Sequence, residues 1–132
     1  YEAAVGAFDA SDGAVMCAAV ADYTPAEVSP TKIKKGDGEM VVRLKRTKDI
    51  AAEAGRVKGN RLLVGFALET DNERNNALDK MRRKNFDFIV LNSLRDKGAG
   101  FSGDTNKITV IDRQGRIAER IEAWFAAVPE KR

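Results

Sequence analysis

Residues 62–91 read LLVGFALETDNERNNALDKMRRKNFDFIVL, and this stretch determines the fold class. It opens with an apolar run at 62–68 and closes with another at 86–91, each of the length of a buried strand. Between them, residues 72–84 carry apolar side chains at helical spacing. Because short apolar strands separated by helices are typical of parallel sheets, the stretch predicts an α/β fold.

The same alternation continues through the rest of the chain. A long loop is expected at 21–38, which contains Pro25 and Pro30. The other predicted elements are helices at 1–8 and 48–57, the second capped by Thr47, and strands at 14–20, 40–44, 107–112 and 116–121. We therefore expect one domain with a Rossmann-like three-layer sandwich, in which helices cover both faces of a mostly parallel sheet and the C-terminal edge is antiparallel.

Composition excludes several classes of site. The 132 residues are 43% hydrophobic and 33% charged, the balance of a globular protein. One cysteine, Cys17, and no histidine exclude an internal disulfide, a Cys/His zinc site and a histidine-based triad. No apolar run has the length of a membrane span, and the first residues lack the pattern of a signal peptide, so a cytoplasmic location is expected. Basic residues without an aromatic motif argue against nucleic-acid binding.

Polar residues follow three of the predicted strands. They occur in 18–22, in 66–69 and at Asn92. Because ligands of open parallel sheets bind beyond the carboxyl ends of the strands, this edge is the expected site. The alternative is that each polar residue simply ends a strand.

Two lysine clusters could meet an anion at that edge. Lys32, Lys34 and Lys35 lie in the predicted loop, where a mobile lysine could close over a phosphate. Lys80 and Lys84 lie four residues apart on one helix face, where like charges repel. The alternatives are a solvated charge run for the loop and complementation of the helix dipole for the helix.

Taken in order, five motifs resemble one family. They are AAVADY at 18–23, KIKK at 32–35, GFALET at 65–70, FDFIVLN at 86–92 and GFSGDTN at 100–106. They are similar to the phosphopantothenoylcysteine synthetase domain of the bacterial bifunctional decarboxylase/synthetase, in the DNA/pantothenate metabolism flavoprotein family. The chain departs from that pattern at 47–50, where Thr-Lys-Asp-Ile replaces Asn-Pro-Asp-Ile, and at 92–94.

The resemblance implies a ligase of coenzyme A biosynthesis. Such an enzyme joins 4'-phosphopantothenate to cysteine with CTP, through an acyl-cytidylate, and releases CMP and pyrophosphate. Magnesium would arrive with the nucleotide, and FMN would belong only to a possible fused or partner decarboxylase domain. The resemblance also implies a homodimer.

The resemblance further assigns residues to roles. Lys32 is the catalytic residue by this likeness, and no metal ligand is implied. The nucleotide contacts would be Met16, Cys17, Ala18, Asp22, Lys48, Asp49, Ile50, Ala51, Phe66, Lys80 and Lys84, and the substrate contacts Ala18, Ala19 and Asn92.

The family's Gly-Gly-Thr turn is absent from residues 1–132. We therefore expect the chain to be the C-terminal two-thirds of such a domain and to have little activity alone. The alternative is a non-catalytic module of the same fold that dimerises or binds a nucleotide.

Overall fold

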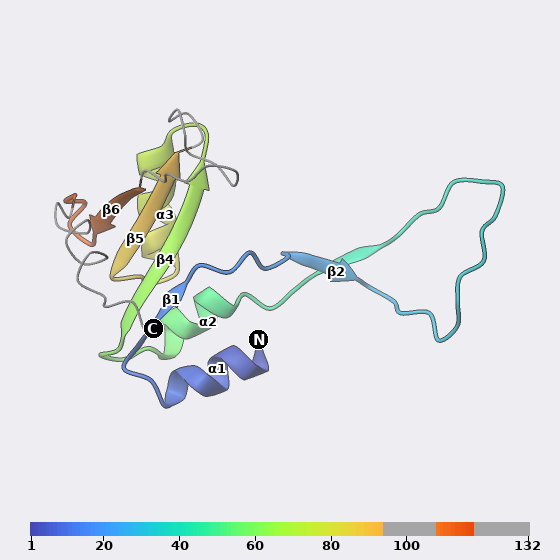
Figure 1. The fold of residues 1–132 in the computed structure, drawn as a ribbon, viewed down its shortest axis with the longest axis horizontal. Helices are drawn as coiled ribbons and strands as arrows, with labels where there is room; N and C mark the ends of the chain where they lie inside the picture. Colours follow the sequence, from blue (N-terminus) through green and yellow to red (C-terminus); the bar gives the residue numbers. More distant parts are fainter. Residues whose placement is uncertain (94–107, 118–132) are drawn as a thin grey trace, which may run out of the picture.

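The computed structural model describes residues 1–93 and 108–117 and shows a small α/β sheet with an extended ribbon (Figure 1). Its elements are α1 (Glu2–Asp9), β1 (Gly13–Met16), β2 (Tyr23–Pro25), β3 (Leu44–Arg46), α2 (Ile50–Val57), β4 (Leu62–Glu69), α3 (Glu73–Arg83), β5 (Phe88–Ser93) and β6 (Ile108–Asp112). None of the helices in these two ranges has the length and apolar character needed to cross a membrane.

The main sheet has the strand order β1-β4-β5-β6. β1 and β5 both run parallel to β4, and β6 pairs antiparallel with β5. The crossovers through α2 and α3 each join parallel neighbours, as the stretch 62–91 predicts. The expected Rossmann-like α/β class, with its mostly parallel sheet and antiparallel edge, is confirmed.

The two faces of β4 differ in their cover. Leu63 and Ala67 are buried, whereas Leu62, Phe66 and Leu68, which alternate with them, are 49%, 36% and 45% exposed. α3 lies behind β4 and β5 in Figure 1 and packs on the buried side. Within the described ranges, therefore, helices cover one face of β4, and these ranges show no second helix layer on the other face.

The core gathers on the helix-covered face. Its largest fully buried side chains are Phe86, Leu63, Ile89 and Ile111. Gly65 lies directly under the Phe86 ring, and a Cβ at that position would overlap the ring. The glycine in the quoted stretch is therefore needed for packing between β4 and the start of β5.

Charged side chains connect the C-terminal ends of α1 and α2 to the sheet at its amino edge. The Lys58 ammonium contacts both carboxylate oxygens of Asp87, at 2.5 and 2.6 Å, and is almost fully buried. Arg61 donates to the carbonyl oxygens of Phe8 (2.8 Å) and Val57 (2.6 Å), close to the C-terminal ends of α1 and α2. Cations at helix C-termini interact favourably with the helix dipole, so these contacts hold α1, α2 and the sheet together.

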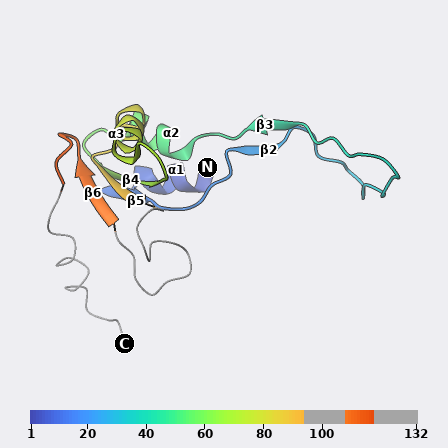
Figure 2. The same cartoon turned by 90° about the horizontal axis from the view of Figure 1, so that it is seen from above.

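β2 and β3 form a separate antiparallel ribbon. Both views show it reaching away from the sheet, with residues 26–43 at its far end (Figure 2). Its base is closed by Thr47, whose side chain donates to the Ala21 carbonyl (2.8 Å) and whose amide donates to the Asp22 carbonyl (2.9 Å).

The ribbon corrects several predicted boundaries. The strand expected at 14–20 ends at Met16, and the one expected at 40–44 lies at Leu44–Arg46. Thr47 binds the ribbon base, so the cap of α2 is Asp49, whose carboxylate accepts from the Ala52 amide at 3.0 Å. The strand expected at 116–121 is a single bridge between Ile111 and Ile117, and its remainder lies outside the described residues.

Candidate anion-binding site

The candidate site begins where β1 and β4 separate. Their last paired residues are Met16 and Gly65, but β4 continues to Glu69. Just beyond the last pair, the Phe66 carbonyl oxygen accepts a hydrogen bond from the Lys80 ammonium at 2.7 Å. This contact brings a positive charge from α3 to the carboxyl end of β4.

Lys80 lies in a mixed electrostatic environment. Partial burial lowers its pKa, as does the charge of Lys84, while the carboxylates of Glu69, Asp49 and Asp22 act in the opposite direction. The net shift of this pKa is downward, mainly because burial disfavours the charged form of the ammonium. A bound anion would favour the charged form.

Lys84 is paired more closely. Its ammonium lies 2.9 Å from a carboxylate oxygen of Asp49, the residue that caps α2. Burial alone would raise the pKa of Asp49, but Lys84 and the amides of Ala52 and Ala51 outweigh it, so the net pKa is lowered. The repulsion expected between Lys80 and Lys84 is therefore partly relieved by an internal carboxylate.

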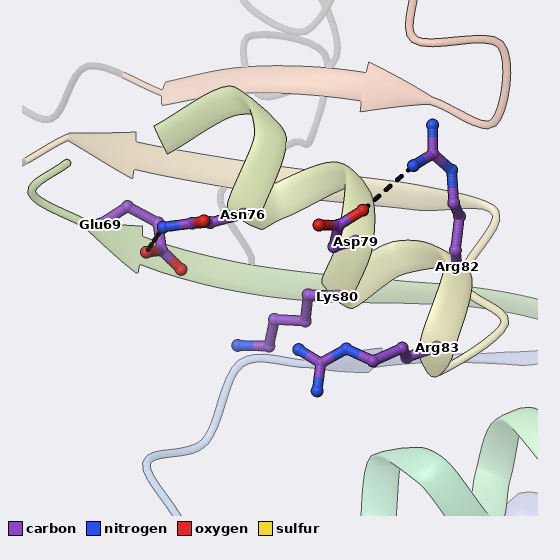
Figure 3. Close-up of a pocket in the computed structure, with 6 residues that line it drawn as sticks. All are labelled: Glu69, Asn76, Asp79, Lys80, Arg82 and Arg83. Carbon is purple, nitrogen blue, oxygen red and sulfur yellow. Dashed lines mark hydrogen bonds and ion pairs between the residues drawn. The ribbon is translucent and has the colours of Figure 1, made fainter. Parts of the chain in front are cut away.

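An open cavity of about 570 Å³ lies along α3 beside this cluster. Its lining residues are Glu69, Asn76, Asp79, Lys80, Arg82 and Arg83 (Figure 3). Figure 3 shows Lys80 and Arg83 extending from the same side of α3, while Arg82 turns toward Asp79. The spacing i,i+3 places Arg83 close to the face of Lys80, but the predicted nucleotide contacts include Lys80 and not Arg83.

The structure brings together only some of the predicted contacts. Asp22, Asp49, Lys80 and Lys84 are within electrostatic reach of one another. Lys32 is exposed and belongs to the segment 26–43, which extends away from the sheet, so the chain itself does not carry it to the Lys80 cavity.

The remaining predicted residues have local roles of their own. Met16 packs against the core, and Cys17 is an exposed free thiol. The Lys48 ammonium lies 4.7 Å above the Tyr1 ring.

The other five predicted residues lie in the first turn of α2, in the segment after β1, and on β5. Ile50 and Ala51 are half-buried in the first turn of α2, and Ala18 and Ala19 are exposed after β1. Asn92 lies near the end of β5, paired with Leu68 and Ile108, and its buried Oδ1 has no hydrogen-bond partner in the described ranges.

The described cavities do not have the lining that a flavin or a metal ion requires. A flavin needs an apolar slot for its flat ring system, but charged and amide side chains line the α3 cavity. A second cavity, at the amino edge, is lined mainly by Lys58, Arg61, Asn85, Asp87 and Arg113. Neither cavity fits a flavin, and residues 1–93 and 108–117 contain no cluster of three potential Cys, Asp or Glu metal ligands.

The sequence matches a family model over residues 1–124. The family is described as the C-terminal domain of the DNA/pantothenate metabolism flavoprotein. A relative from an unknown prokaryotic organism, named cysteine/cysteine sulfinic acid decarboxylase, is 59% identical over 117 residues, which cover 88% of this chain and 33% of the relative. The coenzyme A biosynthesis bifunctional protein CoaBC of Bacillus subtilis is 46% identical over 118 residues, covering 89% of this chain and 29% of that protein.

Solved structures agree with the fold. The C-terminal domain of a coenzyme A biosynthesis bifunctional protein CoaBC has a TM-score of 0.65 and 33% identity, with 89% of this chain and 48% of that one covered. A DNA/pantothenate metabolism flavoprotein from Streptococcus pneumoniae has a TM-score of 0.68, with 89% and 59% covered, and at 19% identity it supports the fold alone. The chain spans about a third of the length of the curated relatives named here.

These comparisons correct the predicted activity. The relative that is 59% identical is named a decarboxylase, and neither curated name is that of a CTP-dependent ligase. The ligase prediction, the synthetase identity of the domain, and CTP with magnesium as co-substrate are therefore not carried forward. The expected connection to coenzyme A biosynthesis and to the flavoprotein family is kept.

Proposed function

Because the chain belongs to the DNA/pantothenate metabolism flavoprotein C-terminal domain family, we propose that it is the α/β domain of a decarboxylase acting on cysteine or an oxidised form of it. The observation that carries this proposal is the 59% identity over 117 residues to the relative named cysteine/cysteine sulfinic acid decarboxylase. A domain of this kind would be one part of a longer protein, since the 117 aligned residues cover a third of that relative.

The carboxyl edge of the sheet supports binding of an acidic group. The half-buried Lys80 ammonium lies there with donors left over from its bond to the Phe66 carbonyl, and the charge of Lys84 is close by. Cysteine and cysteine sulfinic acid both carry carboxylate or sulfinate oxygens, which a lysine ammonium binds through charge-assisted hydrogen bonds. We therefore propose this edge as the place where the domain holds an oxyanion group.

The flavin that the family name implies is proposed to lie outside this chain. FMN supplies redox chemistry when bound, but the described cavities do not fit its ring. In the proposal, residues 1–132 bind and orient an acidic group while another part of the longer protein holds the flavin.

Carbon dioxide release tests the proposal. The natural full-length protein should release labelled CO2 from cysteine or cysteine sulfinic acid that carries 13C in the carboxyl group, as followed by mass spectrometry. The protein should also carry flavin fluorescence as purified. Label retained in both amino acids, with flavin present, would contradict the decarboxylase assignment.

The ribbon favours a second role, association with another copy. Val28, Met40 and Val41 are 89%, 67% and 85% exposed in a segment that extends away from the sheet. Large exposed apolar side chains on one extended segment are typical of protein–protein contacts. We propose that the ribbon segment 23–46 forms a homodimer contact.

Val41→Asp should weaken this dimer. A carboxylate placed in an apolar contact loses hydration without gaining a partner, so we expect the dimer dissociation constant to rise by about thirtyfold or more. Light scattering coupled to size-exclusion chromatography over a concentration series measures it. Asn60→Asp adds the same charge outside the ribbon and should leave the dimer unchanged; equal behaviour of both variants, or a monomeric parent, would contradict the contact.

A further inference from the structure

Arg83 stands out among the charged residues of the α3 cavity. Within the described ranges its guanidinium makes neither a hydrogen bond nor an ion pair, although it lines the same cavity as Lys80. The neighbouring Arg82, one residue earlier on the helix, pairs with Asp79 at 3.0 Å. Among the residues that the structure describes, Arg82 therefore has a carboxylate partner and Arg83 has none.

The carboxylates of the cavity are already engaged. Asp79 accepts from Arg82, and Glu69 accepts from the Asn76 amide at 3.1 Å. Lys80 uses one donor on the Phe66 carbonyl, which leaves its other protons free for a ligand. After these pairings, Lys80 and Arg83 are the two cations lining the cavity that form no ion pair with a described residue.

We propose that Arg83 is a second oxyanion-binding residue of this cavity. Together with Lys80, it binds a carboxylate, sulfinate or phosphate group. The inference rests on the proposed function, because it concerns the same edge of the sheet. Arginine presents a planar fork that matches two oxygens of such a group, and lysine adds a point charge with free donors. The exposed position of Arg83 lets it reach a ligand that enters from solvent, and the half-buried Lys80 extends from the same side of α3.

Matched arginine variants of the natural full-length protein test the assignment. Inorganic phosphate is titrated and followed by 31P line broadening, and cysteine sulfinic acid by saturation-transfer NMR. Arg83→Gln should weaken binding of at least one probe by about tenfold or more, because a charge-assisted bidentate contact is lost. Arg82→Gln removes the same charge from the adjacent position and should change the affinity by less than about twofold, since its guanidinium is committed to Asp79.

Two further variants separate the possible failures. Arg83→Lys keeps the charge but loses the fork, so its affinity should lie between those of the parent and Arg83→Gln. Lys80→Gln should abolish binding. If Lys80→Gln loses binding while Arg83→Gln matches Arg82→Gln, the role of Arg83 is overturned but the site stands. If neither probe binds the parent, both the site and the role of Arg83 are overturned, whatever the outcome of the CO2 assay.

Discussion

Replacing Asp87 with Asn is expected to lower the free energy of unfolding by about 3–5 kcal/mol, because it leaves a buried ammonium without its counter-charge. Lys58 is only 6% exposed, and both oxygens of Asp87 contact its ammonium. The same carboxylate accepts from the Leu63 amide at 2.8 Å and lies 3.1 Å from Arg113. One carboxylate thus joins the end of α2, the start of β4 and the residues after β6.

Urea unfolding of the parent and of Asp87→Asn measures this loss. The control is Asp79→Asn, which removes a carboxylate from an ion pair whose side chains are 71% and 65% exposed. Exposed pairs of this kind contribute about 0–1 kcal/mol, so the control should unfold close to the parent. Equal midpoints for the two variants would show that the Lys58 pair does not stabilise the fold.

The Asp87 carboxylate also makes the free energy of unfolding depend on pH. Burial alone would raise the pKa of Asp87, but Lys58, the Leu63 amide and Arg113 outweigh it, and the net pKa is lowered. A depressed folded-state pKa stabilises the protein at pH values above the unfolded pKa of about 3.9, and this contribution disappears as the pH falls toward the folded value. The difference between the parent and Asp87→Asn should therefore be constant above about pH 5 and should narrow below about pH 4.

The hydrophobic pattern of the sequence was enough to predict those strands and helices that pack against their neighbours along the chain. The stretch 62–91 forms β4, α3 and β5 as its periodicity predicts, because each crossover joins neighbouring strands. The strand predicted at 14–20 ends early because of a contact with a residue far along the chain. Thr47 binds the carbonyls of Ala21 and Asp22 and draws the chain into the ribbon, and this contact spans more than 20 residues.

The site shows the same division. The four-residue spacing of Lys80 and Lys84 was enough to place both on one helix face, and the structure confirms that they are close. The pairing of Lys84 with Asp49 depends on how α2 packs against α3, and so does the lack of a described partner for Arg83. The spacing of residues within one helix does not predict this packing. The activity was a different kind of error: motifs at 18–23 and 65–70 identify the family and fold, and proteins that share a fold can differ in chemistry.

Gly55→Ala is the second substitution with a large expected effect. It should lower the stability of the protein, although helix propensity alone would predict an increase. Alanine in a helix is usually favoured over glycine by about 1 kcal/mol. At Gly55, in α2, an added Cβ would overlap the backbone carbonyl of Lys84 and would lie 3.3 Å from the Asn85 Cβ. The Asn85 side chain also donates to the Gly55 carbonyl at 2.8 Å, so the two backbones are held in contact.

Relief of this overlap would require α2 to move away from the end of α3. That movement would stretch the pairs of Lys84 with Asp49 and of Lys58 with Asp87, which lie on either side of the contact. We therefore expect Gly55→Ala to destabilise the protein by about 2–3 kcal/mol, the cost typical of overpacking.

Gly6→Ala in α1 is the matched control, because a Cβ there meets no atom within 4 Å. It should stabilise the protein by up to about 1 kcal/mol through helix propensity alone. Thermal and urea unfolding of both variants should thus give shifts of opposite sign. A stabilised Gly55→Ala variant would mean that α2 and α3 are not in backbone contact, and the charge pairs that depend on that contact would have to be reassigned.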